Sequence, residues 1–300
     1  MSRYALLPAF VVLAIATLGL AAPEPAPEIE DAVYVYDLFQ GADNCLELFT
    51  RLRRLPLRST VILSVEQGPE FILDHPAGEE KLRCVLRFLN GSLRRVKALF
   101  LQDPGFLRDN QETVRRAALL GEFIARHPGE FAGAQIDVEP HADTKWEATS
   151  ANQRRRLLQG LHEVLRQVRP HLRGLPLGAA VPWWYANMAQ ELPEAAPGAL
   201  FQVADELYVM LYGEEKDLLA WEPARLRHWI GLAPTPSINA RTHLVLATYE
   251  FPSQTHLEAE LKNVRRLLAS HSNFAGTAVF HAQSRFRTKS TGSASFGGGL

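Results

Sequence analysis

GAQIDVEP, residues 133–140, is a short apolar segment that ends in two acids, Asp137 and Glu139. Side chains alternate between the two faces of a strand, so Gln135, Asp137 and Glu139 would share one face of a strand here. Unpaired carboxylates are costly to bury, and the segment contains no Lys or Arg. The pattern therefore predicts a strand with a functional site at its C-terminal end. The simpler alternative is that the two acids cap the next helix or lie in solvent.

Seven other apolar stretches are bounded by turn or helix signals in the same way. Segments with helical periodicity separate them, the clearest at residues 157–168, with Arg and Gln on its polar face. Eight alternations of strand and helix predict the α/β class with a single (β/α)8 TIM barrel. An open doubly wound sheet is the alternative, but no G-x-G-x-x-G turn follows the first predicted strand. The predicted strands are 32–37, 60–66, 96–103, 133–139, 177–184, 206–212, 243–250 and 275–281.

Polar and aromatic residues gather at the C-terminal ends of these strands, where barrel enzymes carry their active sites. Carboxylates can transfer protons and flat rings can stack on pyranose faces, so this combination is typical of a sugar site. Each residue has a structural alternative: an acid at a strand end can cap the next helix, and a Trp can pack in the core. The predicted substrate-binding residues are Asp37, Glu66, Asp103, Gln135, Trp183, Trp184, Glu250 and His281.

Composition excludes several other functions. The 300 residues include 32 basic and 33 acidic side chains, and the net charge of −1 does not indicate a nucleic-acid-binding protein. The ten His residues form no H-x-x-x-H or H-E-x-x-H pair, which predicts no metal site, and no cofactor motif is present. A Ser-His-Asp hydrolase is disfavoured because the chain has no G-x-S-x-G.

The N-terminus predicts export. Residues 1–21 combine Arg3, an apolar core and a small-residue cleavage site, which together indicate a signal peptide, with an uncleaved membrane anchor as the alternative. Residues 22–30 then predict a disordered lead-in, 31–287 the barrel, and 288–300 a disordered tail. We therefore expect a periplasmic or extracellular protein that is not inserted in the membrane once the signal peptide is cleaved. In such a compartment Cys45 and Cys84 can form a disulfide or remain two free thiols.

The segment QIDVE, residues 135–139, resembles the strand-four signature D-x-x-D-x-D-x-E of family 18 glycoside hydrolases, the chitinases and endo-β-N-acetylglucosaminidases. The segment VMLY, residues 209–212, is similar to that family's M-x-Y-D, and the resemblance loosely spans the mature chain. It implies that Glu139 is the general acid, that Asp137 orients the substrate's N-acetyl group, and that Tyr212 hydrogen-bonds the acetamido oxygen.

The chain departs from the family pattern at four positions. Ala132 and Gln135 stand where the strand-four signature has its first two acids, Gly213 replaces the acid of the sixth strand, and Phe280 takes the place of the eighth-strand Trp. Relatedness to the superfamily is therefore a firmer expectation than chitinase activity.

The leading hypothesis is an exported glycosidase that acts on a polysaccharide containing N-acetylhexosamine, through acid catalysis by Glu139 with substrate assistance. One alternative is a retaining glycosidase of clan A type, with Glu139 as acid/base and Glu250 as nucleophile. The other is a non-catalytic barrel that only binds glycans. In the enzyme hypotheses, the charge of Asp137 should raise the pKa of Glu139 and keep it protonated near neutral pH.

Overall fold

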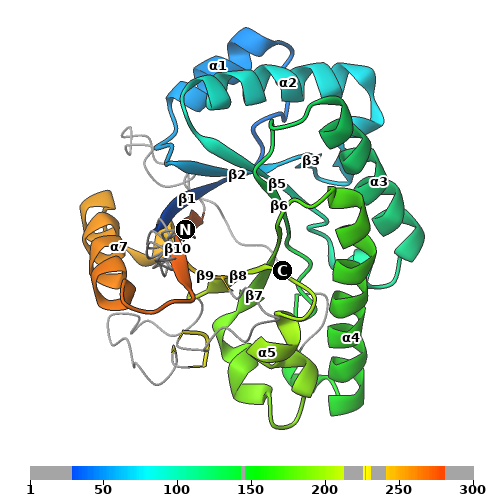
Figure 1. Ribbon diagram of the computed structural model, residues 1–300, viewed down its shortest axis with the longest axis vertical. Coiled ribbons are helices and arrows are strands. Elements are labelled where there is room, and N and C mark those ends of the chain that lie inside the picture. The colour runs from blue at the N-terminus through cyan, green and yellow to red at the C-terminus, as the bar shows by residue number, and fades with distance from the viewer. Residues whose placement is uncertain (1–28, 143–145, 213–225, 227, 231–240, 281–300) are drawn as a thin grey trace, which may run out of the picture.

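The computed structural model describes residues 29–142, 146–212, 226, 228–230 and 241–280. Eight parallel strands close into a barrel surrounded by helices (Figure 1), which confirms the predicted (β/α)8 fold. Each predicted strand is present, and most end earlier than the apolar stretch that predicted them. In barrel order the strands are β1 (Glu30–Val35), β2 (Thr60–Ser64), β5 (Arg95–Phe100), β6 (Gly133–Ile136), β7 (Leu177–Pro182), β8 (Glu206–Met210), β9 (Arg241–Ala247) and β10 (Phe274–Phe280).

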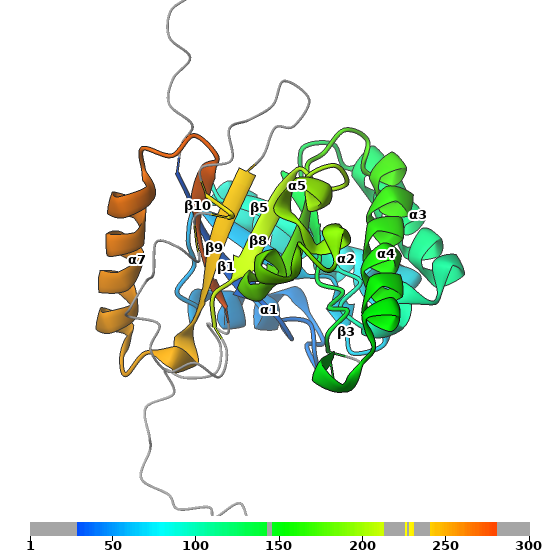
Figure 2. The ribbon, with the colours of Figure 1, turned by 90° about the horizontal axis from the view of Figure 1, so that it is seen from below.

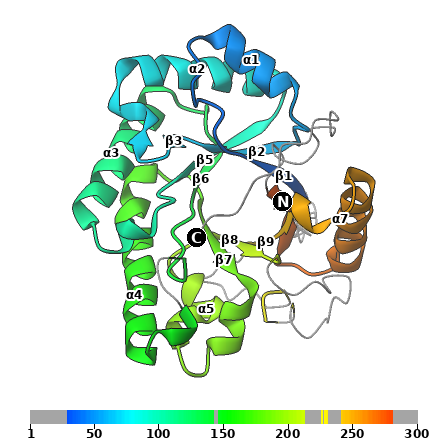
Figure 3. The same ribbon diagram turned by 180° about the vertical axis from the view of Figure 1, so that it is seen from behind.

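The outer layer consists of helices that follow the strands. Helices α3 and α4 lie side by side on one flank and α7 lies on the opposite flank, as Figures 2 and 3 show from two further directions. The α-helices are α1 (Cys45–Arg53), α2 (Pro76–Gly91), α3 (Asn110–Arg126), α4 (Ala151–Val168), α5 (Pro197–Leu200) and α7 (Gln254–Leu268). Short 3-10 helices are η1 (Ile72–Asp74), η2 (Pro104–Leu107), η3 (Trp146–Ala148), η4 (Arg169–Leu172), η5 (Trp183–Met188), η6 (Pro193–Ala195) and η7 (Thr248–Glu250), and β3 (Glu66–Gln67) pairs with β4 (Glu70–Phe71) in a separate ribbon.

Helix α4 shows how the sequence specifies this layer. Ser150 and Gln153 form a capping box at its start, so two backbone N–H groups that the helix leaves unpaired find acceptors. Leu158, Leu161 and Leu165 repeat at helical spacing and are fully buried against the barrel. The predicted apolar stripe is therefore confirmed.

Barrel closure requires a glycine. Strand β10 pairs with β1, and Gly276 lies opposite Glu30 in a backbone conformation with φ 154°. A Cβ atom at Gly276 would overlap the carbonyl oxygen of Glu30. Only glycine combines this conformation with so close an approach of the two backbones.

Cys45 and Cys84 form a disulfide that joins the start of α1 to α2, with their Cα atoms 5.8 Å apart. The two helices are neighbours on the outer ring (Figure 1), as expected from their order in the chain. Of the two states that the sequence left open, the structure contains the disulfide.

A buried charge cluster fills the N-terminal end of the barrel interior. Lys97 of β5 donates hydrogen bonds to Glu30 of β1 (3.1 Å) and to Glu206 of β8 (2.7 Å), and all three side chains are at least nine-tenths buried. Lys97 also donates to the hydroxyl of Tyr208 (2.7 Å), whose ring stacks on His243. Burial disfavours the charged form of Glu206, but His243 and Lys97 outweigh it and hold its pKa below the usual range. These contacts explain why β1 begins at Glu30, which the sequence placed in the lead-in.

Residues 1–28 and 281–300, which include the predicted signal peptide and tail, lie outside the described part of the chain. Among the described residues, no helix has both the length and the apolar character needed to cross a bilayer.

Replacing Lys97 with Met should destabilise the protein by about 3–5 kcal/mol, because it removes the buried cation that hydrogen-bonds both Glu30 and Glu206 and leaves them with longer ion pairs, such as those to the more exposed Arg241. Denaturant unfolding at neutral pH measures this loss. Lys262→Met removes an exposed lysine from α7 and is the matched control. Equal stability of the two variants would contradict the role assigned to Lys97.

Candidate active site

Asp137 and Glu139 follow directly after β6, at the C-terminal end of the barrel. The alternation predicted from the sequence is present: Ile136 and Val138 are buried, whereas the side chain of Glu139 is 28% exposed and Asp137 is partly exposed. Gln135, one step earlier on the same face, is fully buried in the barrel interior. The strand therefore delivers two acids to the mouth of the barrel.

Asp137 is held from the opposite side of the barrel. The hydroxyl of Tyr36, which follows β1, donates a hydrogen bond of 3.1 Å to Asp137 Oδ2. Burial raises the pKa of Asp137 to about 6, and the negative charge of Glu66 adds to this effect, while the bond from Tyr36 opposes it. Asp137 can therefore ionise at neutral pH.

Glu139 holds its proton more strongly. Burial and then the charge of Asp137 raise the pKa of Glu139 to about 8. Within the described part of the chain, the basic group beside Glu139 is His141, with 3.7 Å between His141 Nε2 and Glu139 Oε2. Burial lowers the pKa of His141 to about 4, so this neighbour is uncharged. Between about pH 6 and 8 the pair thus combines one carboxylate with one carboxylic acid.

Aromatic rings form two walls around the acids. One wall contains Tyr36, Tyr212 and Phe280, with Tyr212 stacked on Phe280 at 5.0 Å between ring centroids. Tyr249 meets the edge of Tyr212 at 6.0 Å and is 41% exposed, so it extends this wall toward solvent. The opposite wall groups rings around His141, namely Trp146, Trp184 and Tyr185.

A cleft of about 500 Å³ adjoins the acids on the β1 side. Tyr36 lines this cleft and also donates a hydrogen bond to Asp137, so this tyrosine stands between the cleft and the acid pair. Its other lining residues come from the loops after β1, β2 and β5 and include Asp37, Gln102, Asp103 and Phe106.

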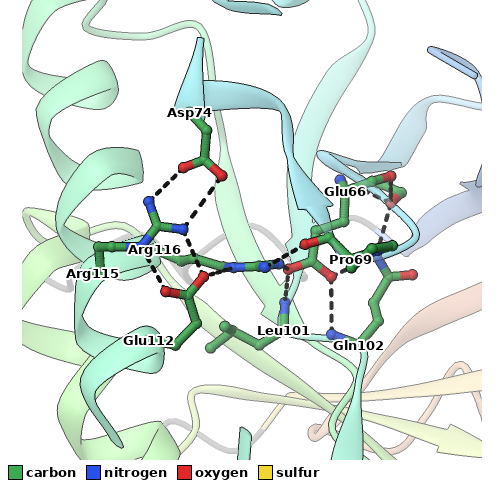
Figure 4. A network of polar contacts seen from close by, with 9 residues as sticks. Glu66, Pro69, Asp74, Leu101, Gln102, Glu112, Arg115 and Arg116 are labelled. Carbon is green, nitrogen blue, oxygen red and sulfur yellow. Dashed lines mark hydrogen bonds and ion pairs between the residues drawn. The ribbon is translucent and has the colours of Figure 1, made fainter. Parts of the chain in front are cut away.

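Glu66 serves the structure of this region rather than a free binding function (Figure 4). Its carboxylate forms an ion pair with Arg116 of α3 (2.7 Å) and accepts hydrogen bonds from the backbone N–H groups of Leu101 (2.9 Å) and Gln102 (3.1 Å). Glu66 lines the cleft, but its oxygens are already engaged. The role of Glu66 in substrate binding stays a prediction, and any such role has to coexist with these contacts.

The structure gives two further predicted binding residues contacts within the protein. Asp103 caps η2, where its side chain accepts a hydrogen bond of 2.6 Å from the N–H of Gly105, the capping alternative that the sequence left open. Gln135 is fully buried and donates a hydrogen bond to the hydroxyl of Tyr34, so it lies below the acids in the barrel interior. Asp37 is exposed and lines the cleft, as a binding residue would.

The remaining predicted residues are spread around the mouth of the barrel. Trp183 is partly buried, and its carbonyl accepts a hydrogen bond from the indole of Trp229 (2.8 Å). Trp184 lies with its ring 5.2 Å from that of His141. Glu250 is partly buried in η7. Burial and then the charge of Asp137 raise the pKa of Tyr212, which places Tyr212 beside the acids. His281 lies outside the described residues.

Three residues that lie beside the acids were not among the predicted site residues, namely Tyr36, His141 and Tyr185. The sequence contained a signal for Tyr36. Alternation along the strand YVYD (34–37) places Tyr36 on the inward face and the terminal Asp37 on the other face. The signal for His141 was weaker: it stands two residues after Glu139, beyond Pro140, in a turn. Nothing in the sequence linked Tyr185 to these residues, because it is 44 positions from His141.

The chain matches no protein-family model and no curated protein sequence. Among solved structures it is similar to a protein assigned as an α-L-fucosidase from Bacteroides thetaiotaomicron, with 12% identity, coverage of 91% of both chains and a TM-score of 0.53. It is also similar to a β-1,4-mannanase from the sea hare Aplysia kurodai, with 11% identity, coverage of 86% of this chain and 90% of that chain, and a TM-score of 0.53.

The C-terminal domain of a protein assigned as a chitinase from Desulfitobacterium hafniense gives 11% identity, coverage of 74% and 66%, and a TM-score of 0.48. At these identities the comparisons define the class by fold alone. The protein has the TIM-barrel fold shared by glycoside hydrolases.

Replacing Asp137 with Asn should lower the pKa of Glu139 from about 8, because the neighbouring negative charge is lost. NMR titration of carboxyl-labelled glutamate, assigned with the Glu139→Gln variant, measures the change. Asp37→Asn removes a negative charge from the cleft on the far side of Tyr36 and serves as the control. A Glu139 pKa that stays the same in Asp137→Asn would show that the two acids are not coupled.

Proposed function

We propose that the protein is an exported glycoside hydrolase that acts on a polysaccharide containing N-acetylhexosamine. The observation that carries this proposal is the placement of Asp137 and Glu139 at the C-terminal mouth of the barrel, with tyrosine and phenylalanine rings beside them. Burial raises the pKa of both acids, and the charge of Asp137 raises that of Glu139 further. A protonated carboxylic acid can donate to a glycosidic oxygen, and separated pKa values in two adjacent acids are a mark of acid catalysis. The proteins of similar fold include a mannanase and an assigned fucosidase, which supports a glycan substrate.

In the proposed reaction, Glu139 transfers its proton to the glycosidic oxygen as the bond to the anomeric carbon breaks. The carbonyl oxygen of the substrate's N-acetyl group attacks that carbon from the other face, and water then opens the cyclic intermediate and returns a proton to Glu139. The Asp137 carboxylate would accept a hydrogen bond from the acetamido N–H, and Tyr212 would donate one to its oxygen. The aromatic wall of Tyr212, Tyr249 and Phe280 offers ring faces for a pyranose unit.

The position of the charges favours this mechanism over the one that uses Glu250. The negative charge that raises the pKa of Glu139 is that of Asp137, which is therefore the electrostatic partner of the acid. A retaining mechanism with Glu250 as nucleophile would leave Asp137 without a chemical role. A barrel that only binds glycans would have no use for an acid that is protonated at neutral pH.

Export is supported by the Cys45–Cys84 disulfide, because disulfides form and persist in oxidising compartments. Together with the N-terminal signal pattern, it is consistent with a periplasmic or extracellular location for the mature barrel.

Replacing Glu139 with Gln should lower turnover about 100- to 10,000-fold, since the amide keeps the shape of the side chain and cannot supply the proton. Reducing-end release from a panel of N-acetylhexosamine glycans and other polysaccharides measures this effect. The Glu250→Gln variant is the matched comparison and should retain activity. Loss of activity in both variants would support the two-carboxylate mechanism, and an active Glu139→Gln variant would refute the proposal.

Reduction of the Cys45–Cys84 disulfide should destabilise the mature protein by about 4 kcal/mol, because the bond closes a loop with a sequence separation of 39 residues. Denaturant unfolding with and without a thiol reductant measures this loss. The Cys45→Ala/Cys84→Ala double variant should show the same lower stability and no response to the reductant. Free thiols in protein isolated from its native compartment would contradict the proposed location.

A further inference from the structure

A tight turn brings His141 back to the acid that precedes it. The carbonyl of Glu139 accepts a hydrogen bond from the N–H of Ala142 (3.0 Å), so residues 139–142 form a β-turn. Pro140 occupies the second position of this turn, where its fixed φ is favourable. As a result, the imidazole of His141 lies beside the carboxyl group of Glu139, with Nε2 3.7 Å from Oε2.

The opposite side of the imidazole is also held. The hydroxyl of Tyr185 lies 3.4 Å from His141 Nδ1, and Tyr185 is completely buried. The rings of Trp184 and Tyr185 meet the imidazole nearly edge to face, at centroid distances of 5.2 and 5.9 Å. These contacts fix the plane of the imidazole and direct Nε2 toward Glu139.

The contact with Tyr185 selects the tautomer of His141. A buried hydroxyl requires an acceptor, and among the described residues Nδ1 of His141 lies within hydrogen-bonding distance of the Tyr185 hydroxyl. Burial raises the pKa of Tyr185 well above its usual value, so the hydroxyl keeps its proton and can donate. A neutral imidazole that accepts at Nδ1 carries its single proton on Nε2. The N–H group of His141 therefore faces Glu139.

The charges around this pair keep His141 neutral and Glu139 protonated. His141 faces Glu139 and Tyr185, and the charge of Glu147 only partly opposes the burial that lowers its pKa. Glu139 faces the ionisable groups Asp137 and His141, together with tyrosines whose pKa values are raised, namely Tyr34, Tyr185, Tyr212 and Tyr249. A charged imidazolium here would strip the proton from Glu139, because an adjacent positive charge lowers the pKa of a carboxyl group. A neutral donor avoids this.

We propose that His141 is a positioning residue whose neutral Nε2–H group orients Glu139 and stabilises its carboxylate as Glu139 gives its proton to the leaving group. This inference rests on the proposed function. The O–H bond of Glu139 breaks, the proton bonds to the glycosidic oxygen, and the electron pair stays on Glu139, while His141 keeps its own proton throughout. The distance of 3.7 Å must shorten by less than 1 Å to form a hydrogen bond, and such contacts often tighten only when substrate binds.

Histidine-selective ¹⁵N NMR tests the arrangement without a substrate. The spectrum of the intact barrel, assigned by comparison with His141→Gln, should show His141 as the neutral Nε2–H tautomer at pH 6. Its Nε2 shift should follow a titration near pH 8 that disappears in Glu139→Gln. A proton on Nδ1, a charged imidazole at pH 6, or an Nε2 shift that ignores Glu139 would overturn the proposal, whatever reaction the protein catalyses.

Kinetics on the substrate found with the glycan panel test the role in catalysis. His141→Phe keeps the ring packing but removes both nitrogens, and kcat should fall about 10- to 100-fold with little change in KM. The basic limb of the pH–rate profile should move to higher pH, because the Glu139 carboxylate loses a stabilising donor. His141→Gln, whose amide N–H can replace Nε2–H, should recover most of both losses.

Outcomes for the two proposals are separable. If Glu139→Gln abolishes turnover but His141→Phe leaves kcat and the basic limb unchanged, the role of His141 is refuted and the glycosidase stands. If Glu139→Gln remains active, the proposed function itself fails. Should His141→Phe not fold, as judged by circular dichroism, Tyr185→Phe decides: freeing Nδ1 should move the basic limb in the same direction by a smaller amount, and an unmoved limb would overturn the proposal.

Discussion

A closed barrel has no exposed face inside, so each carboxylate in its interior must find a counter-charge or keep its proton. The two ends of this barrel meet that constraint in opposite ways. At the N-terminal end, Lys97 lies between Glu30 and Glu206, and the pKa values of both acids are lowered. At the C-terminal end, Asp137 and Glu139 contact a tyrosine hydroxyl and a neutral imidazole, and their pKa values are raised. The acids at one end are therefore charged and paired, whereas those at the other end hold their protons more strongly.

The raised pKa values at the C-terminal end come at the expense of stability. A carboxyl group whose pKa is higher in the folded than in the unfolded state stabilises the fold below its unfolded pKa, and that contribution is lost as pH rises through the folded pKa. For Glu139 this interval runs from about 4.5 to about 8, which includes neutral pH. The continuous hydrogen-bonded ring of strands, the helix layer and the Lys97 cluster must offset this cost. A local cost in stability of this kind is expected at a site that performs chemistry.

The sequence was sufficient to predict the barrel, because buried strands appear in a sequence as short apolar stretches and the helices that cover them as amphipathic segments. It also placed Asp137 and Glu139 on one face, since alternation along a strand is a local rule. It failed where the answer depended on distant partners. Glu66 looked like a binding acid, but its role is set by Arg116, 50 positions further along the chain. Asp103 and Gln135 likewise could not be distinguished from ligand contacts until a backbone N–H and the hydroxyl of Tyr34 were located. The role of His141 depended on a contact with Tyr185, which no local pattern encodes.

The charge of the site also constrains the sugar it can accept. In the described structure, Asp137 is ionised at neutral pH and contacts a hydroxyl group rather than a cation, while Arg116 beside the cleft is already paired with Glu66 and Glu112. A uronic acid or a sulfated sugar beside Asp137 would add a second negative charge at low dielectric without a free counter-charge among these residues. It would also raise the pKa of Glu139 further and make the proton harder to give up. A neutral sugar avoids both penalties, and in the proposed reaction an acetamido N–H would donate to the Asp137 carboxylate. The electrostatics of the site are thus consistent with the N-acetylhexosamine substrate that the sequence motif suggested.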